Sequence, residues 1–245
     1  MATAIAITSG KGGTGKTSLT GGVASCLAAL GSRVLCIDMD IGMRNLDISL
    51  GMTDRALMDF TDVLAGRCSL ERAAVPHPVI EGLYLLNAPL TLSGPLPLNE
   101  MADLVAAAKT QFDYILMDSP AGLGDGFHLA TRCADRAVVV STTDSSALRD
   151  AQRTVAVLTG ILPHIHLVVN RVQPKLLRRL HTTIDDAMDT AGLPLLGIVP
   201  EDPQVMLCAN LGQPLILRAS RGAATAYLNI AKRLLGQKVS LMKLR

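Results

Sequence analysis

The chain has 245 residues, a length that suits one sizeable α/β domain with a single core. Hydrophobic residues make up 49% and aromatic residues only 2%, so the core has to be built from aliphatic side chains, as in buried parallel strands covered by helices. The net charge of +2, with 18% charged residues, indicates no strong field for nucleic acid or an acidic ligand, although charge alone excludes neither.

The five cysteines are odd in number, widely spaced and without a C-x-x-C pair, a pattern typical of buried thiols in a reducing compartment. The amino terminus lacks a basic segment followed by a long apolar run, and no stretch approaches the roughly 18 uninterrupted apolar residues of a membrane span. We therefore expect a cytoplasmic protein.

The first apolar run, residues 2–8, leads into a glycine-rich turn. From Gly10 to Thr17 the sequence fits the pattern G-x-x-x-x-G-K-[ST], which binds phosphate when a strand precedes it and a helix follows. We predict that its four glycines turn the backbone with φ > 0 and bring N–H groups close to phosphate oxygens. These glycines are Gly10, Gly12, Gly13 and Gly15.

Side chains and the following helix complete the predicted phosphate site. Lys16 supplies a cation for the β- and γ-phosphates, and the Thr17 hydroxyl is placed to ligate Mg²⁺. A helix expected over residues 18–30 adds the positive end of its dipole. We expect the whole loop to contact the nucleotide, namely Gly10, Lys11, Gly12, Gly13, Thr14, Gly15, Lys16, Thr17 and Ser18.

A second lysine, Lys11, directly follows the first glycine of the loop. In a loop folded around one anion its side chain either crowds the same phosphates or points away, and pointing away it can reach a neighbouring subunit. The alternative is a solvated surface lysine, which residue type alone favours.

The run 33–38 ends in a carboxylate and is the expected second strand. Later segments repeat this form, with helix-length segments between them; they are 83–86, 114–118, 137–141, 166–170 and 195–199. This alternation predicts an α/β fold, a mostly parallel twisted sheet with helices on both faces, and with the phosphate loop it resembles the SIMIBI-like P-loop NTPases. Prolines between residues 75 and 98 indicate loops around one strand. We expect one domain over 1–236 and a short basic and apolar tail over 237–245.

Carboxylates follow two of these strands beside the phosphate loop. Hydrolysis needs a group that holds water in line with the γ-phosphate, and we assign Asp40 to it, with Asp38 nearer the Mg²⁺ shell. Asp118 ends a strand of Walker B form and is expected on the magnesium side, although many buried strands end in Asp. The expected catalytic residues are Lys16 and Asp40, joined by Lys11 if its side chain reaches the nucleotide of a neighbouring subunit, and the expected metal ligands are Thr17, Asp38 and Asp118.

Polar residues at two later strand ends suit the base of a nucleotide. Asn170 and Arg171 follow one strand, and an amide can pair with both edge groups of adenine. Residues after the last strand are expected to close the other side of the pocket; they are Pro200, Glu201 and Asp202. Either group alone is equally consistent with an ordinary turn, but their joint presence favours the pocket.

Several segments in this order resemble the MinD/ParA family of ATPases, which have a deviant Walker A loop. They are 11–17 (KGGTGKT), 38–47 (DMDIGMRNLD), 118–122 (DSPAG), 145–150 (SSALRD) and 200–205 (PEDPQV). The branch that selects the cell division site is more similar than the plasmid-partition branch, which usually has D-x-D-P-Q-x-N, or the flagellar-number branch, which usually has a small residue at Arg44. The nitrogenase iron protein and iron–sulfur carrier relatives need paired cluster cysteines, which this chain lacks.

The resemblance implies an ATPase that uses ATP and Mg²⁺ and forms an ATP-dependent homodimer, with Lys11 crossing into the partner's nucleotide. It also implies binding to the inner face of the cell membrane, recruitment of a MinC-like inhibitor of FtsZ assembly, and control by a MinE-like or DivIVA-linked regulator. No sequence-specific nucleic acid is implied. Family members usually continue past Gly236 into a basic amphipathic helix, so here we expect only weak membrane binding through the tail.

Two other classes stay open. A ParA-like or flagellar-number-type positioning ATPase would act on DNA or a protein cargo, and a small basic cluster suits DNA: Arg171, Lys175, Arg178 and Arg179. An assembly module that binds ATP without hydrolysing it is the non-enzyme alternative, and phosphate release distinguishes it from the others.

Overall fold

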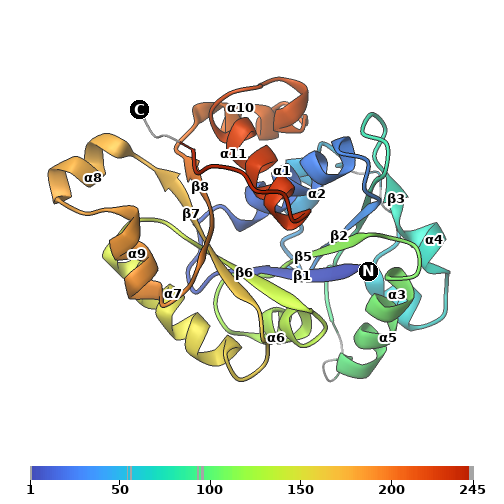
Figure 1. Ribbon diagram of the computed structural model, residues 1–245. Coiled ribbons are helices and arrows are strands. Elements are labelled where there is room, and N and C mark those ends of the chain that lie inside the picture. The colour runs from blue at the N-terminus through green and yellow to red at the C-terminus, as the bar shows by residue number, and fades with distance from the viewer. Residues whose placement is uncertain (1, 54, 56, 93, 95–96, 243–245) are drawn as a thin grey trace.

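The short apolar runs form one sheet with helices packed on both faces (Figure 1). The computed structural model describes residues 2–53, 55, 57–92, 94 and 97–242. Within these residues the sheet has eight strands in the order β3-β4-β2-β5-β1-β6-β7-β8. The strands are β1 Thr3–Thr8, β2 Val34–Asp38, β3 Val75–Pro76, β4 Leu83–Leu86, β5 Tyr114–Asp118, β6 Arg136–Ser141, β7 Ile165–Val172 and β8 Leu195–Pro200.

Helices bury both faces of this sheet. In chain order they are α1 Lys16–Ala29, α2 Leu46–Leu50, α3 Phe60–Leu64, α4 Leu70–Ala73, α5 Leu98–Ala108, α6 Asp125–Arg132, α7 Ser145–Leu158, α8 Pro174–Leu180, α9 Ile184–Ala191, α10 Pro203–Asn210, the 3₁₀ helix η1 Leu215–Leu217 and α11 Ala223–Leu234. One core joins a face of the sheet to α1, α2 and α11, and a second joins the other face to α5, α6, α7 and α9 (Figure 1). Burial from both sides explains the continuous apolar strands, and the predicted α/β sheet is confirmed. Among the described residues, each helix is too short or too polar to span a lipid bilayer.

One short strand differs from the prediction. The sequence predicts loops around a single strand between residues 75 and 98, whereas the structure adds β3, which pairs antiparallel with β4. Pro76 suits this edge position, because an edge strand needs backbone donors on one side only. The proline-rich region therefore extends the same sheet.

The parallel register brings the predicted site residues to one edge of the sheet. Asp38 at the end of β2 lies opposite Asp118 at the end of β5, and Asp118 also lies opposite Ile7 near the end of β1. Since the glycine-rich loop leaves β1 after Thr8, both carboxylates lie beside it.

Helix α1, which follows this loop, is held by close packing against α11. A Cβ atom at Gly22 would lie 2.2 Å from Cδ2 of Tyr227, so only a glycine allows the two helices to approach this closely. Tyr227 is almost fully buried at the contact. The packing fixes the position of α1 and so of the loop from which it starts.

The chain after α11 turns back onto the body. The helix is terminated by Gly236, two residues after its last residue, with φ 78°, and the N–H of Gln237 donates to the carbonyl of Lys232, as in a Schellman motif. The Arg233 guanidinium then donates to the carbonyls of residues 239 and 240, both at 3.0 Å. Met242 packs against the core. The described part of the predicted tail thus lies on the protein; its last residues, Lys243, Leu244 and Arg245, lie outside the described residues.

Candidate functional site

The glycine-rich loop uses its glycines in two different ways. Gly13 and Gly15 have φ values of 78° and 85°, as predicted. The prediction of φ > 0 is wrong for Gly10 and Gly12, which do not occupy the left-handed region. Gly10 is needed for close packing instead, because a Cβ atom there would lie 2.3 Å from the carbonyl oxygen of Asp150 in α7. The first glycine of the motif therefore seats the loop on α7.

Lys16 lies inside the loop and is 7% exposed. Its Nζ donates to the Ser9 hydroxyl at 2.8 Å. Burial lowers the pKa of Lys16, while the negative charges of Asp118 and Asp40 act in the opposite direction. The predicted phosphate cation thus lies at the sheet edge, close to the carboxylates of Asp118 and Asp40.

Asp118 is fully buried at the base of the loop. It accepts a hydrogen bond from the Thr20 hydroxyl at 2.9 Å and another from the side chain of Thr17. The pKa of Asp118 is raised to about 7, chiefly by burial and also by the neighbouring charge of Asp38, while the two hydrogen bonds and Lys16 act in the opposite direction. The structure therefore brings together Thr17 and Asp118, two of the three predicted metal ligands.

Asp38 is occupied by backbone contacts. One carboxylate oxygen accepts the N–H of Asp40 at 2.8 Å and the other accepts the N–H of Leu46 at 3.1 Å. Burial raises the pKa of Asp38 to about 6. These bonds hold the loop that carries Asp40, which is partly buried and close enough for the Lys16 charge to lower its pKa while burial raises it. A metal-binding role for Asp38 stays a prediction.

The residues around the loop fit a magnesium-bound nucleotide. Thr17 and Asp118 provide oxygen atoms of the kind that Mg²⁺ prefers. Within the described ranges, no group of three or more His, Cys, Asp and Glu side chains is placed to hold a metal. The buried Thr14 hydroxyl finds no hydrogen-bond partner in the described part of the chain, so it retains bonding capacity for a ligand.

A pocket of about 520 Å³ opens beside the loop, at the ends of β7 and β8. The predicted base-pocket residues all border it, together with Ser18 at the start of α1; they are Asn170, Arg171, Pro200, Glu201 and Asp202. Asp202 also has a structural role, because its carboxylate accepts the N–H groups of Gln204 and Ala223 and so caps two helices.

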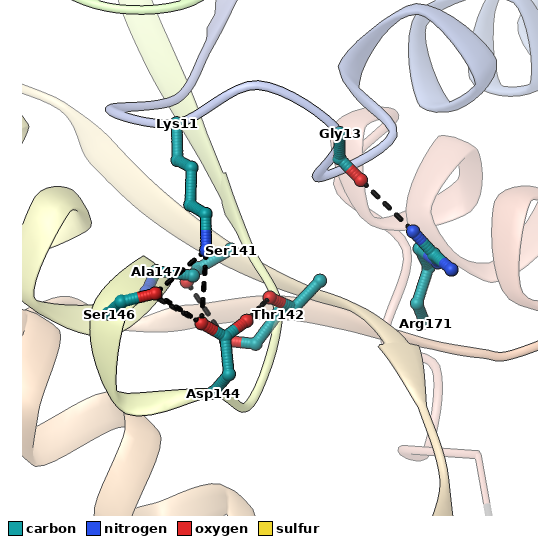
Figure 2. Close-up of polar contacts among 8 residues, drawn as sticks. All are labelled: Lys11, Gly13, Ser141, Thr142, Asp144, Ser146, Ala147 and Arg171. Carbon is teal, nitrogen blue, oxygen red and sulfur yellow. Dashed lines mark hydrogen bonds and ion pairs between the residues drawn. The ribbon is translucent and has the colours of Figure 1, made fainter.

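Asn170 and Arg171 contact the loop itself. The Asn170 amide donates to the carbonyl of Thr14 at 2.7 Å and accepts the N–H of Arg171 at 2.9 Å. Arg171 donates to the carbonyl of Gly13 at 3.2 Å (Figure 2). It also donates to Glu201 at 2.8 Å. The pairing of Asn170 with adenine stays a prediction. The amide oxygen keeps one free lone pair that is available for this pairing.

Lys11 points away from the loop interior toward the start of α7 (Figure 2). Its Nζ donates to the Ser146 hydroxyl at 2.7 Å and lies 3.4 Å from Asp144. Burial raises the pKa of Asp144, but hydrogen bonds from Thr142, Ser146 and the Ala147 N–H, together with the Lys11 charge, lower it more. Of the two orientations considered from sequence, crowding of the same phosphates is thus excluded in this conformation.

Four contact residues of the site were not predicted from sequence: Ser9, Thr20, Asp144 and Ser146. Asp144 carries a usable signal, because a short polar residue between a strand and a helix is typical of an N-cap, and it accepts the Ala147 N–H. Thr20 lies one helical turn after Lys16 and so on the same face of α1. No pattern in the sequence indicates the contact of Ser9.

Comparison with known proteins gives consistent matches along the whole chain. The ParA family model, described as NUBPL iron-transfer P-loop NTPase, matches residues 1–235. The septum site-determining protein MinD of Bacillus subtilis is 40% identical over 250 residues, covering 100% of this chain and 93% of that protein. In the MinC:MinD cell division protein complex of Aquifex aeolicus, one chain is 36% identical with a TM-score of 0.92, covering 99% of both chains. MinD of Pyrococcus horikoshii, solved with Mg-ADP, is 29% identical with a TM-score of 0.84, covering 96% of each chain.

The buried Asp118 gives a pH-dependent prediction for the nucleotide-free protein. Burial raises its pKa from 3.8 to about 7, so the folded state binds this proton more tightly than the unfolded state. Ionisation of the buried Asp118 destabilises the folded state. This destabilisation is absent below about pH 4, grows as the pH rises toward 7 and is complete above about pH 7. Asp118→Asn, which stays neutral, should therefore exceed wild type in unfolding free energy by up to a few kcal/mol at about pH 8, and by less at about pH 5.

Urea unfolding at the two pH values measures this difference. Asp103→Asn, on the exposed surface of α5, is the matched control and should show no such dependence. An advantage of Asp118→Asn that is the same at both pH values would contradict the burial argument.

Proposed function

Because the chain belongs to the MinD/ParA family of P-loop ATPases, in which it is a septum site-determining ATPase of the MinD type, we propose that it is an ATP-dependent dimerising switch. The switch places a division inhibitor at the inner face of the cell membrane and so selects the division site. Lys11 carries this proposal, because it points out of its own phosphate loop.

The nucleotide is ATP with Mg²⁺. The loop N–H groups and Lys16 bind its phosphates, Thr17 and Asp118 hold the metal, and the pocket between Arg171 and Glu201 takes the base. Mg²⁺ neutralises phosphate charge when it is bound. The relative from Pyrococcus horikoshii supports this assignment, since it was solved with Mg-ADP at 29% identity.

Dimerisation requires Lys11 to leave its contacts at α7. Lys11 and Asp144 are 44% and 53% exposed, and pairs this exposed contribute only about 0–1 kcal/mol. A charge-assisted contact with a partner's γ-phosphate in a closed interface is stronger. ATP therefore favours the dimer, whereas ADP lacks the group that Lys11 would contact.

A MinC-like division inhibitor is the proposed cargo. The complex from Aquifex aeolicus supports this, because it contains MinC with a MinD chain 36% identical to this one. We place the partner surface on residues 145–153 of α7, next to the contacts of Lys11, so that dimerisation changes it. A MinE-like or DivIVA-linked regulator would act at the same surface.

Membrane binding is assigned to the tail, and the ATPase domain to residues 1–236. Leu241 is 51% exposed and Lys238 is also exposed, so both are available to lipid without unfolding. The bonds of Arg233 to the carbonyls of residues 239 and 240 hold part of the tail on the protein, so each copy is a weak anchor. Two copies in one dimer raise the effective concentration and bind reversibly.

The alternatives considered from sequence have less support. A ParA-like ATPase acting on DNA would use exposed basic residues on α8, namely Lys175, Arg178 and Arg179. A flagellar-number-type positioning ATPase has no particular contact in its favour. A module that binds ATP without hydrolysis does not fit an ATPase of the MinD type.

We expect ATP with Mg²⁺ to dimerise the wild-type chain and ADP to leave it monomeric. Lys16→Ala should weaken nucleotide binding about 10- to 100-fold, because it removes a buried charge-assisted hydrogen bond to phosphate. Lys11→Ala should keep most of the affinity and lose the dimer, because its contact is made across the interface. Light scattering and nucleotide titration measure the two effects separately.

Lys109→Ala is the matched control, since Lys109 is another partly exposed lysine with an ion-pair partner. It should dimerise like wild type. Normal ATP-dependent dimerisation of Lys11→Ala would show that Lys11 is an ordinary surface lysine.

Asp40→Ala should bind ATP and dimerise but hydrolyse slowly. The change removes the carboxylate that positions water while the phosphate loop stays intact, and a loss of about 100-fold or more is expected. A single-turnover phosphate-release assay gives the rate, with Asp103→Ala on the exposed face of α5 as control. Wild-type turnover by the Asp40→Ala protein would remove this residue from the mechanism.

The tail should support weak binding to anionic lipid only in the dimer. Each basic residue near such a surface contributes about 1 kcal/mol, and neutral vesicles should therefore bind less. Co-sedimentation with ATP is measured for the full chain and for a chain ending at Gly236 whose ATPase activity is unchanged. Equal pelleting of the two chains, or none of either, would exclude the tail as an anchor.

A further inference from the structure

Two adjacent residues at the end of β7 donate hydrogen bonds to three consecutive carbonyls of the phosphate loop. The Asn170 amide donates to the carbonyl of Thr14 at 2.7 Å and to that of Gly15 at 3.5 Å. Arg171 donates to the carbonyl of Gly13 at 3.2 Å (Figure 2). One strand end therefore contacts the outer side of the loop along its whole turn.

An irregularity in β7 makes this double contact possible. In a regular strand neighbouring side chains point to opposite faces, so Asn170 and Arg171 would not reach the same loop. The β7–β8 register shifts between Val169 and Val172, and Arg171 has φ 54° in the left-handed region. A non-glycine residue is uncommon there and persists only where its surroundings hold it.

Further contacts hold both side chains in place. Glu201 accepts the Arg171 Nε at 2.8 Å, and its own N–H donates to the Val172 carbonyl at 3.0 Å, so the guanidinium is anchored to the sheet. The Asn170 amide oxygen accepts the Arg171 N–H at 2.9 Å, which turns the amide NH₂ toward the loop. A Cβ atom at Gly15 would lie 2.4 Å from that nitrogen, so glycine is needed for the approach.

Holding the carbonyls also sets the direction of the N–H groups. In a planar trans peptide the carbonyl of one residue and the N–H of the next point in opposite directions. Fixing the carbonyls of residues 13, 14 and 15 outward therefore aims the N–H groups of residues 14, 15 and 16 into the loop, where phosphate oxygens bind.

We propose that Asn170, Arg171 and Glu201 form a brace that presets the phosphate loop before nucleotide binds. In this proposal Arg171 is a positioning residue, since it acts on the phosphates through the Gly13 carbonyl. The inference rests on the proposed nucleotide site and adds a function for a residue expected from sequence to contact the nucleotide.

A probe without a base separates this role from base recognition. Displacement of a fluorescent ADP analogue gives the affinities of ADP and of inorganic tripolyphosphate, each with Mg²⁺. Arg171→Met should weaken both about 10-fold, the loss expected for one charge-assisted hydrogen bond. Arg178→Met is the matched control, because Arg178 bonds only within α8 among the described contacts, and it should change neither. Weaker ADP binding with unchanged tripolyphosphate binding, or no change in either, would overturn the brace.

A second variant distinguishes the loss of probe binding from a loss of folding stability. Glycine adopts φ 54° without strain, so Arg171→Gly should keep or raise the urea midpoint while weakening both probes like Arg171→Met. Hydrogen exchange of residues 12–16 in the nucleotide-free protein should be faster in both variants than in wild type. Unchanged exchange would contradict presetting of the loop. Failure of the wild-type chain to bind ADP would instead contradict the proposed function.

Discussion

The site depends on two ionisable groups of opposite sign that are buried at the carboxyl edge of the central strands. Asp118 and Lys16 are 2% and 7% exposed, and burial shifts the pKa of each toward its neutral form. Because their charges are opposite, each group reduces the free-energy cost of burying the other. Each also has a hydroxyl partner, Ser9 for Lys16 and Thr20 for Asp118. A phosphate beside the lysine and Mg²⁺ beside the carboxylate would stabilise the charged form of each group. The nucleotide-free site is therefore arranged for a metal–phosphate pair and is less favourable without it.

The two lysines of the loop between β1 and α1 have different roles. Lys16 points inward to Ser9, whose hydroxyl in turn donates to the carbonyl of Lys11, while the Lys11 side chain points outward to α7. Gly10 packs on Asp150 of the same helix, so α7 supports the loop and also holds its outward lysine. Movement of the Lys11 side chain therefore affects α7, the helix on which we place the partner surface.

Sequence reasoning identified the parts of the structure that depend on local pattern. Apolar runs ending in polar residues located the parallel strands, and the motif located Lys16, Thr17 and Asp118 at their carboxyl ends. Sequence reasoning did not predict contacts between segments that are far apart in the chain. The need for glycine at residue 10 comes from a carbonyl 140 positions later, and the short strand β3 is defined by its pairing with β4. Likewise the joint contact of Asn170 and Arg171 with the loop requires an irregular register, which no spacing of apolar residues indicates.

The central claim is that Lys11 acts on the partner's nucleotide while Asp40 acts on its own. ATP turnover of an equimolar mixture of Lys11→Ala and Asp40→Ala proteins tests it directly. In a mixed dimer, the subunit with an intact Asp40 receives the intact Lys11 of the other, so one of the two sites is complete. Because Lys11→Ala does not dimerise with itself, the account predicts a turnover above the sum of the two separate proteins and at most about half of wild type, the level reached when every dimer is mixed. A mixture as inactive as its separate components would contradict the account.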